Sequence, residues 1–128
     1  MWIMKFADGE RVHFIDRKER HYPLTLRKGK VFQFSGETIA HDDIIGREDG
    51  AAVTFSKGSQ FIVIRPTLAE HILKMPRGAQ VIYPKDIGMI LICGDIYPGA
   101  TVVEAGMGSG GLTMALLRGV GERGVVIS

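Results

Sequence analysis

The chain has a single cysteine, Cys93, among its 128 residues, which excludes an internal disulfide. One cysteine fits a reducing compartment, and we predict a cytoplasmic protein in which Cys93 is a small apolar side chain of a buried helix. No apolar run approaches the roughly 20 residues of a membrane span. The N-terminal residues lack the basic start and the cleavage site of a signal peptide. We therefore expect neither membrane insertion nor secretion.

Metal and nucleophile motifs are also missing. The chain has four histidines: His13, His21, His41 and His71. None has the spacing to a cysteine or carboxylate that is typical of a metal site. The nearest candidate, His41-Asp42-Asp43, is better explained as a turn with side-chain capping. Gly108-Ser109-Gly110 lacks the G-x-S-x-G frame of a nucleophile elbow, so we expect no bound metal and no covalent intermediate.

The charge is nearly balanced but unevenly distributed. The formal net charge is only +2, which is too small by itself to indicate a nucleic-acid partner. Residues 11–30 contain seven Lys or Arg and two acids, whereas residues 37–49 contain five acids and one Arg. This segregation indicates a surface that faces a partner, although solvated strand faces would also explain it.

The first half of the chain contains short runs that alternate between apolar and polar residues. Gly-containing turns separate them at intervals of roughly ten residues, which is typical of a small antiparallel barrel or sandwich. In the first run, Val12 and Phe14 share one face. We predict a β domain over residues 1–65 with strands at 11–16, 21–26, 30–34, 51–55 and 60–64.

The pattern changes near Pro66. Leu68, Ile72 and Leu73 have helical spacing over residues 66–74, and a second helix is predicted over 87–95 with Ile87, Ile90 and Leu91 inward. A strand from residue 101, a helix over 112–120 and a strand over 124–127 follow. This helix, helix, β, α, β order is the beginning of an α/β, Rossmann-like domain over residues 66–128. One crossover leaves such a sheet incomplete, so we expect a fragment of a longer protein.

Residues 101–111, TVVEAGMGSGG, carry the strongest functional signal. A β-branched strand ends in Glu104, and four glycines follow before an apolar helix. This order brings backbone N–H groups close to a nucleotide-like ligand at a helix N-terminus. Glycines permit that approach and the positive φ angles of the turn. We predict a cofactor pocket here.

The choice of cofactor depends on Glu104. Gly106-x-Gly108-x-x-Gly111 matches the dinucleotide fingerprint, and a lone match is weak. A carboxylate at the strand end would repel a diphosphate, whereas it suits the cationic S-adenosylmethionine. The run from Glu104 to Gly110 resembles motif I of the class I S-adenosylmethionine methyltransferases. A glycine turn without a ligand is the remaining alternative.

Three segments together carry a closer resemblance: HDDIIG, MPRGAQVIYPKD and GDIYPGATVVEAGMGSGGLTMALLRGVG. In this order, behind a β-rich domain, they resemble the tRNA (adenine-N1)-methyltransferases that modify the T-loop adenosine. The resemblance implies S-adenosyl-L-methionine as cofactor, tRNA as partner and a homotetramer. It also implies that the catalytic Asp and the ribose-binding acid lie beyond Ser128, so that the chain alone would be inactive. The open edge of the incomplete sheet further predicts that the chain alone self-associates.

The resemblance also implies site residues. Those expected at the cofactor are Gln80, Tyr83, Glu104, Gly106, Met107, Gly108, Ser109, Gly110 and Gly111. Lys85 and Asp86 would order the adjacent loop, although residues 83–86 also read as a plain helix N-terminus. Candidates for tRNA phosphate contacts are Arg17, Lys18, Arg20, Arg27, Lys28, Arg77 and Lys85, with solvated surface charge as the alternative.

Two other functions stay open. The glycine loop is compatible with a dinucleotide-dependent oxidoreductase, and the β domain is compatible with a non-catalytic module for tRNA docking or assembly. Titration with NAD and S-adenosylhomocysteine separates the first from a methyltransferase.

Overall fold

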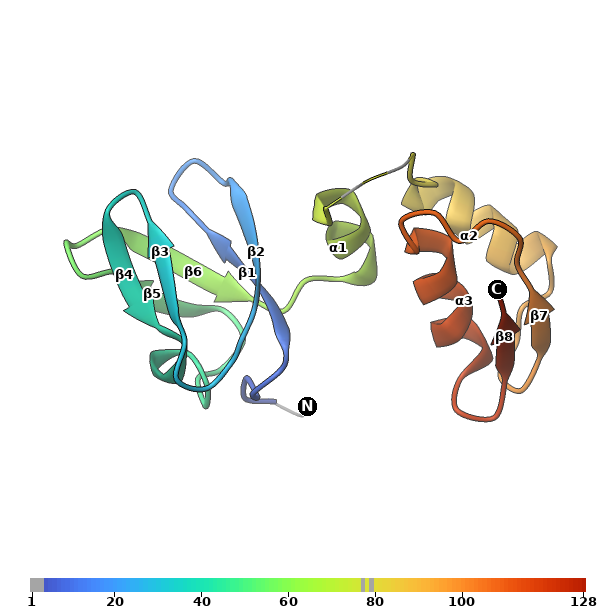
Figure 1. The fold of residues 1–128 in the computed structure, drawn as a ribbon, viewed down its shortest axis with the longest axis horizontal. Coiled ribbons are helices and arrows are strands. Elements are labelled where there is room, and N and C mark those ends of the chain that lie inside the picture. Colours follow the sequence, from blue (N-terminus) through green and yellow to red (C-terminus); the bar gives the residue numbers. More distant parts are fainter. Residues whose placement is uncertain (1–3, 77, 79) are drawn as a thin grey trace. The chain divides into compact units, whose positions relative to one another are not determined.

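The structure is a computed structural model that describes residues 4–76, 78 and 80–128. The chain forms two compact units, Met1–Thr67 and Leu68–Ser128, and each is described separately (Figure 1). The elements of the first unit are β1 (Arg11–Ile15), β2 (His21–Thr25), β3 (Val31–Phe34), β4 (Glu37–Ala40), the 3₁₀ helix η1 (His41–Asp43), β5 (Ala51–Thr54) and β6 (Gln60–Ile64).

The first unit is an antiparallel β structure. Four strands form a sheet in the order β2-β1-β6-β5, and β3 and β4 form a separate hairpin. The alternation in β1 predicts its buried face correctly, because Val12 and Phe14 are both fully buried. In the register, Phe14 pairs with Tyr22 on β2 and with Val63 on β6. The prediction of a small barrel-like or sandwich-like β domain is confirmed.

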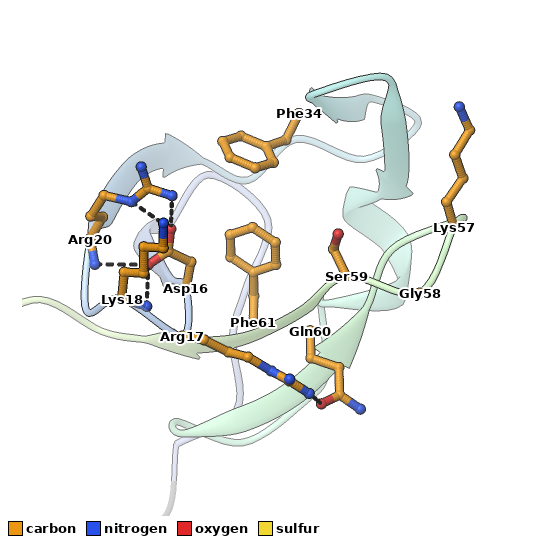
Figure 2. A pocket seen from close by; sticks show the side chains of 10 residues that line it. All are labelled: Asp16, Arg17, Lys18, Arg20, Phe34, Lys57, Gly58, Ser59, Gln60 and Phe61. Carbon is orange, nitrogen blue, oxygen red and sulfur yellow. Dashed lines mark hydrogen bonds and ion pairs between the residues drawn. The ribbon is translucent and has the colours of Figure 1, made fainter.

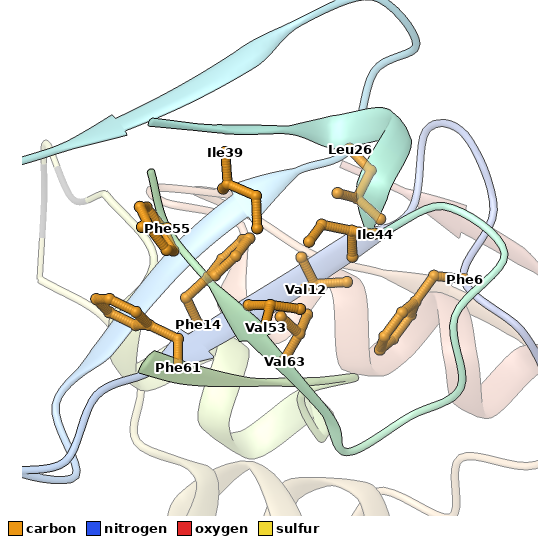
Figure 3. Packing of buried hydrophobic residues seen from close by; sticks show 10 residues of the cluster. All are labelled: Phe6, Val12, Phe14, Leu26, Ile39, Ile44, Val53, Phe55, Phe61 and Val63. Atoms are coloured by element: carbon orange, nitrogen blue, oxygen red, sulfur yellow. The ribbon is translucent and has the colours of Figure 1, made fainter. Parts of the chain in front are cut away.

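An aromatic cluster fills the core between the sheet and the hairpin (Figure 3). The Phe14 ring lies 5.1 Å from Phe32, 5.9 Å from Phe55 and 6.3 Å from Phe61, measured between ring centroids. Tilted and edge-to-face pairs of this kind stabilise a core beyond the burial of their area. The buried core residues are Phe6, Val12, Phe14, Leu26, Ile39, Ile44, Val53, Phe55, Phe61 and Val63.

Strand β4 is absent from the sequence prediction. Ser35 and Gly36 were expected to separate two elements, and they form a two-residue hairpin turn with φ angles of 50° and 77°. Two successive positive φ angles match the twist of the flanking strands. Phe34 therefore pairs directly with Glu37, and the four residues Glu37–Ala40 form β4.

The segment His41-Asp42-Asp43, predicted as a turn with side-chain capping, forms the single turn of the 3₁₀ helix η1, which has no side-chain cap hydrogen bond. The buried His41 ring accepts a hydrogen bond at Nδ1 from the Arg27 N–H, at 2.9 Å. Burial lowers the pKa of His41, which keeps the ring neutral and able to accept this bond. The imidazole thus packs in the β unit and binds the backbone after β2.

The second unit contains α1 (Leu68–Lys74), α2 (Pro84–Cys93), β7 (Thr101–Val103), α3 (Gly111–Val120) and β8 (Val125–Ile127). β7 and β8 are parallel and pair Val102 with Val126. α3 connects them, so the unit holds one βαβ crossover as the sequence indicates. The prediction of a Rossmann-like beginning behind a β domain is confirmed. Within the described residues, no helix is long and apolar enough to cross a bilayer.

Three side chains of the second unit differ from expectation. Ile87 is buried, but Ile90 is 36% exposed, because α2 packs on α1 and α3 through the narrower stripe of Ile87 and Leu91. Leu73 is exposed on the short helix α1, where Ile72 is the buried residue. Cys93 is exposed at the end of α2, so its predicted burial is wrong.

Glu37 produces a prediction about acid stability. Its buried carboxylate accepts hydrogen bonds from the backbone N–H groups of Lys57 and Ser59, at 2.9 and 3.1 Å, and from the Ser59 hydroxyl. The Ser59 hydrogen bonds, first that of the hydroxyl, hold the pKa of Glu37 below its usual value against the effect of burial. Glu37 therefore stabilises the fold above pH about 4.5, and this stability is lost as the pH falls through the lowered folded pKa.

We expect Glu37→Gln to lower the melting temperature at pH 7 and to flatten its fall between pH 5 and about pH 3. Thermal unfolding followed by circular dichroism at several pH values measures both effects. Glu48→Gln, at an exposed carboxyl, is the matched control. If the melting temperature of Glu37→Gln depends on pH in parallel with that of the unchanged chain, Glu37 does not contribute to the loss of stability in acid.

Candidate functional site

The glycine loop joins the end of β7 to the start of α3. Gly106, Gly108 and Gly110 have φ angles of +77°, +55° and +85°, in the left-handed region that side chains other than glycine rarely adopt. The Gly110 N–H donates to the Met107 carbonyl at 2.9 Å, which closes the last turn of the loop before the helix. The glycines are required by backbone conformation, as the sequence analysis expected.

Gly111 has a different role. A Cβ at this position would lie 2.9 Å from Val81 Cγ2 and 3.4 Å from Ile72 Cγ2. The first residue of α3 is therefore packed too closely against α1 and the segment before α2 to carry a side chain. This contact fixes the direction in which the N-terminus of α3 points.

Glu104 is held by a residue that the sequence analysis missed. The Thr113 hydroxyl, in the first turn of α3, donates to Glu104 Oε2 at 2.6 Å. The bond spans the glycine loop, since Glu104 precedes the loop and Thr113 follows it. Both side chains are partly buried, and the bond orients a carboxylate at the end of a parallel strand. The sequence feature that could have indicated this contact is a short hydroxyl side chain in the first helical turn after the glycine loop.

The segment from Gln80 to Asp86 lies partly beside the loop. The Gln80 carbonyl oxygen is 4.0 Å from the position of a Cβ at Gly108. Tyr83 is the N-cap of α2 and is 51% exposed, and Asp86 lies in the first turn of that helix. The sequence left open whether residues 83–86 form a helix N-terminus, and in the structure they do. Lys85 is exposed on α2, and Arg77 lies outside the described residues.

This arrangement is suited to binding a small polar ligand. The loop leaves Gly106, Met107 and Gly108 exposed, and α3 begins directly after it, where the first backbone N–H groups of a helix have no partner within the helix and can bind a ligand. The Gln80 carbonyl lies beside Gly108 and Glu104 is tied to α3 through Thr113, while Tyr83 is the N-cap of α2. Among the described residues, no three His, Cys, Asp or Glu side chains gather where they could hold a metal ion.

The residues predicted to contact phosphates lie at two separate places in the β unit. Arg17, Lys18 and Arg20 share the loop between β1 and β2. Arg27 and Lys28 follow β2 at the opposite end of this hairpin, where the Lys28 N–H donates to Asp8 Oδ1. The fold therefore separates residues that look like one basic segment in the sequence.

Asp16 organises the first of these places. Its carboxylate accepts from the backbone N–H groups of Lys18 and Arg20, at 2.9 and 3.0 Å, and pairs with the Arg20 guanidinium at 2.7 Å. Burial would raise the pKa of Asp16, but hydrogen bonds from Arg20, Lys18 and Tyr22 lower it to about 2. The loop is held by a carboxylate that stays ionised.

Two family models match successive parts of the chain. A model described as "TrmI-like N-terminal" matches residues 5–53, and one described as "tRNA methyltransferase complex GCD14 subunit" matches residues 60–128. A curated relative, the tRNA (adenine(58)-N(1))-methyltransferase TrmI of Thermus thermophilus, is 42% identical over 113 residues, which are 88% of this chain and 44% of the relative.

Two solved structures are similar over nearly the whole chain. A SAM-dependent O-methyltransferase from Thermotoga maritima superposes with a TM-score of 0.81 at 28% identity, covering 95% of this chain and 46% of that one. The tRNA (m1A58) methyltransferase TrmI from Aquifex aeolicus gives 0.67 at 31% identity, covering 96% and 47%. The chain thus spans about half the length of the proteins it matches. Because the GCD14 model matches more than half of its residues, the chain belongs to the tRNA methyltransferase family that this model describes.

Proposed function

We propose that the whole protein transfers a methyl group from S-adenosylmethionine to N1 of a T-loop adenosine in tRNA. The observation that carries the proposal is the glycine loop of positive-φ residues bounded by Glu104, in a chain of this family. A relative that shares 42% identity is named as a tRNA (adenine(58)-N(1))-methyltransferase. The cofactor brings an activated methyl group, so the protein has to bind and orient rather than to form a covalent intermediate.

The residues of the loop fit this cofactor. A Cβ at Gly106 would meet no other atom within 4 Å, and a Cβ at Gly108 would meet only the Gln80 carbonyl oxygen, at 4.0 Å, so a ligand has room to approach the backbone there. We propose that residues 106–111 surround the methionine part and that the Glu104 carboxylate faces its cationic groups. Gln80 and Tyr83 would flank the pocket, and Lys85 and Asp86 would order the adjoining loop. Thr113 joins this set as the residue that orients Glu104.

The electrostatics of the loop argue against a dinucleotide. Glu104 is partly buried at the end of β7, and its Thr113 partner is neutral. An ionised carboxylate at this place repels a diphosphate and attracts an ammonium or sulfonium group. In calorimetric titrations of the whole protein, we expect S-adenosylhomocysteine to bind and NAD not to bind. If the protein binds tRNA but binds neither S-adenosylhomocysteine nor NAD, the non-catalytic docking module is favoured.

Further properties are proposed from the sequence and the family relationship. From the change of sequence pattern near Pro66 we propose a domain boundary between residues 65 and 66, and from the family relationship we propose a cytoplasmic location, RNA binding and assembly as a homotetramer. The single cysteine supports a reducing compartment. Light scattering of the whole protein measures the oligomeric state.

The methylation itself has a direct test. The whole protein is incubated with unmodified tRNA and labelled S-adenosylmethionine, and the nucleosides are analysed by mass spectrometry. We expect 1-methyladenosine in the T loop. Label in another nucleoside, or in protein alone, would refute the assignment.

A substitution in the loop tests the pocket. Gly108→Val places a β-branched side chain at φ +55° and in the ligand space, so we expect S-adenosylhomocysteine affinity to fall by more than about a hundredfold. Gly46→Val is the matched control, because it imposes a similar strain at φ +89° in the β unit. We expect the control to keep its cofactor affinity, measured by calorimetry. Near-normal affinity in Gly108→Val would place the pocket elsewhere.

Thr113 gives a finer test. Thr113→Val keeps the shape of the side chain and removes the hydroxyl that holds Glu104, so we expect about a tenfold loss of S-adenosylhomocysteine affinity. Thr113→Ser retains the hydroxyl and should bind within about twofold of the unchanged protein. Equal affinities for the two variants would show that the orientation of Glu104 does not matter for binding.

A further inference from the structure

A cavity of about 490 Å³ lies at one end of the β unit, between the β1–β2 loop and the turn that joins β5 to β6 (Figure 2). Its volume is in the range of ligand sites. A single carboxylate, Asp16, lines it. Its cationic lining residues are Arg17, Lys18, Arg20 and Lys57.

The cations of this cavity are only partly neutralised. Asp16 is paired with Arg20. Arg17 donates to the neutral amide oxygen of Gln60 at 2.7 Å and keeps its charge available. Within the part of the chain that the structure describes, neither Lys18 nor Lys57 forms an ion pair. The cavity therefore has an excess of positive charge and is suited to an anion.

Between the two basic segments the cavity has an aromatic wall. Phe34 and Phe61 point toward one another there, with ring centroids 5.3 Å apart and planes at 81° (Figure 2). Phe61 is buried in the core, whereas Phe34 is only half-buried and presents part of its ring to the cavity. A partly exposed aromatic ring beside cations is a surface on which an unpaired base packs while its phosphates are neutralised.

Both basic segments are held in place before any ligand arrives. Asp16 fixes the β1–β2 loop through the N–H groups of Lys18 and Arg20. Glu37 fixes the other turn through the N–H groups of Lys57 and Ser59. Two carboxylates, the partly buried Asp16 and the buried Glu37, thus order the two segments that carry the cations. Such order reduces the entropy lost on binding.

We propose that this cavity binds an unpaired nucleotide of the RNA substrate, with its flanking phosphates at Arg17, Lys18 and Lys57 and its base against Phe34. The proposal rests on the proposed function for the presence of an RNA substrate. It assigns the β unit a contact that is separate from the glycine loop.

The test uses two double variants of the whole protein with the same change in charge. Lys18→Glu with Lys57→Glu reverses the charge of two lysines that line the cavity, whereas Lys5→Glu with Lys30→Glu makes the same change in charge at exposed lysines of the β unit that do not line it. For the cavity variant, we expect tRNA affinity at low salt to fall at least about tenfold and the slope of log K against log salt to decrease by about 1.5. The control should change little.

Enzyme kinetics and cofactor titration separate this proposal from the proposed function. The cavity variant should raise KM for tRNA, with unchanged kcat and unchanged S-adenosylhomocysteine affinity. If the unchanged protein methylates tRNA and both double variants bind it equally well, the cavity proposal fails and the function stands. If tRNA binding depends on these lysines but no 1-methyladenosine forms, the cavity stands and the function fails.

Two further measurements test whether a base packs on Phe34 and whether the bound phosphate belongs to RNA or to a free nucleotide. Phe34→Leu preserves an apolar side chain and removes the ring, so we expect loss of the ultraviolet crosslink between RNA and peptides from residues 11–34 in a variant whose circular dichroism spectrum shows that it is folded. A crosslink that persists in Phe34→Leu would refute base packing there. Adenosine 5′-monophosphate should not bind at micromolar concentration, and tight binding that the cavity variant loses would overturn RNA as the ligand.

Discussion

The close packing at Gly111 is the constraint on which the functional half of the chain depends. A Cβ there would meet Val81 at 2.9 Å and Ile72 at 3.4 Å, so only glycine lets α3 begin against α1 and the segment before α2. The glycine loop has then to turn sharply from β7 into a helix whose start is already fixed. Gly106, Gly108 and Gly110 make this turn with positive φ angles, and the hydrogen bond from Thr113 to Glu104 ties the two ends of the loop together.

In the β unit, the corresponding constraint is the antiparallel pairing of β1 with β6. Ile15 pairs with Ile62, although 47 residues separate them in the sequence. This pairing brings the loop after β1 to the turn before β6, and so places Arg17 opposite Lys57 across Phe34 and Phe61. Asp16 and Glu37 are acids within basic surroundings, and each accepts backbone N–H groups of a turn. Hydrogen bonds to these two carboxylates therefore order the segments that carry the positive charge.

Local patterns predicted most of the fold and the glycine loop. β7, the glycines and α3 are contiguous, so a β-branched run, a turn composition and an apolar helix sufficed to predict a βαβ crossover. Strand β4 was missed because its four residues begin with Glu37, a charged residue that is buried for a reason visible only in three dimensions. Ile90 and Cys93 were expected to be buried because they are apolar. In the structure, only some of the apolar residues of α2 face the neighbouring helices, and these two do not.

Contacts between distant residues explain why the remaining site could not be predicted. The charge count of residues 11–30 mixes a loop and a turn from opposite ends of one hairpin, so it indicates a basic surface without locating it. Lys57 lies outside that segment and completes the cavity, while Arg27 lies inside it and points toward Gly9 at the other end. The two ends of a five-residue strand lie further apart than neighbouring phosphates of a nucleic-acid strand, so cations at opposite ends cannot contact the same nucleotide. Topology, and not local composition, therefore decides which cations can act on the same nucleotide.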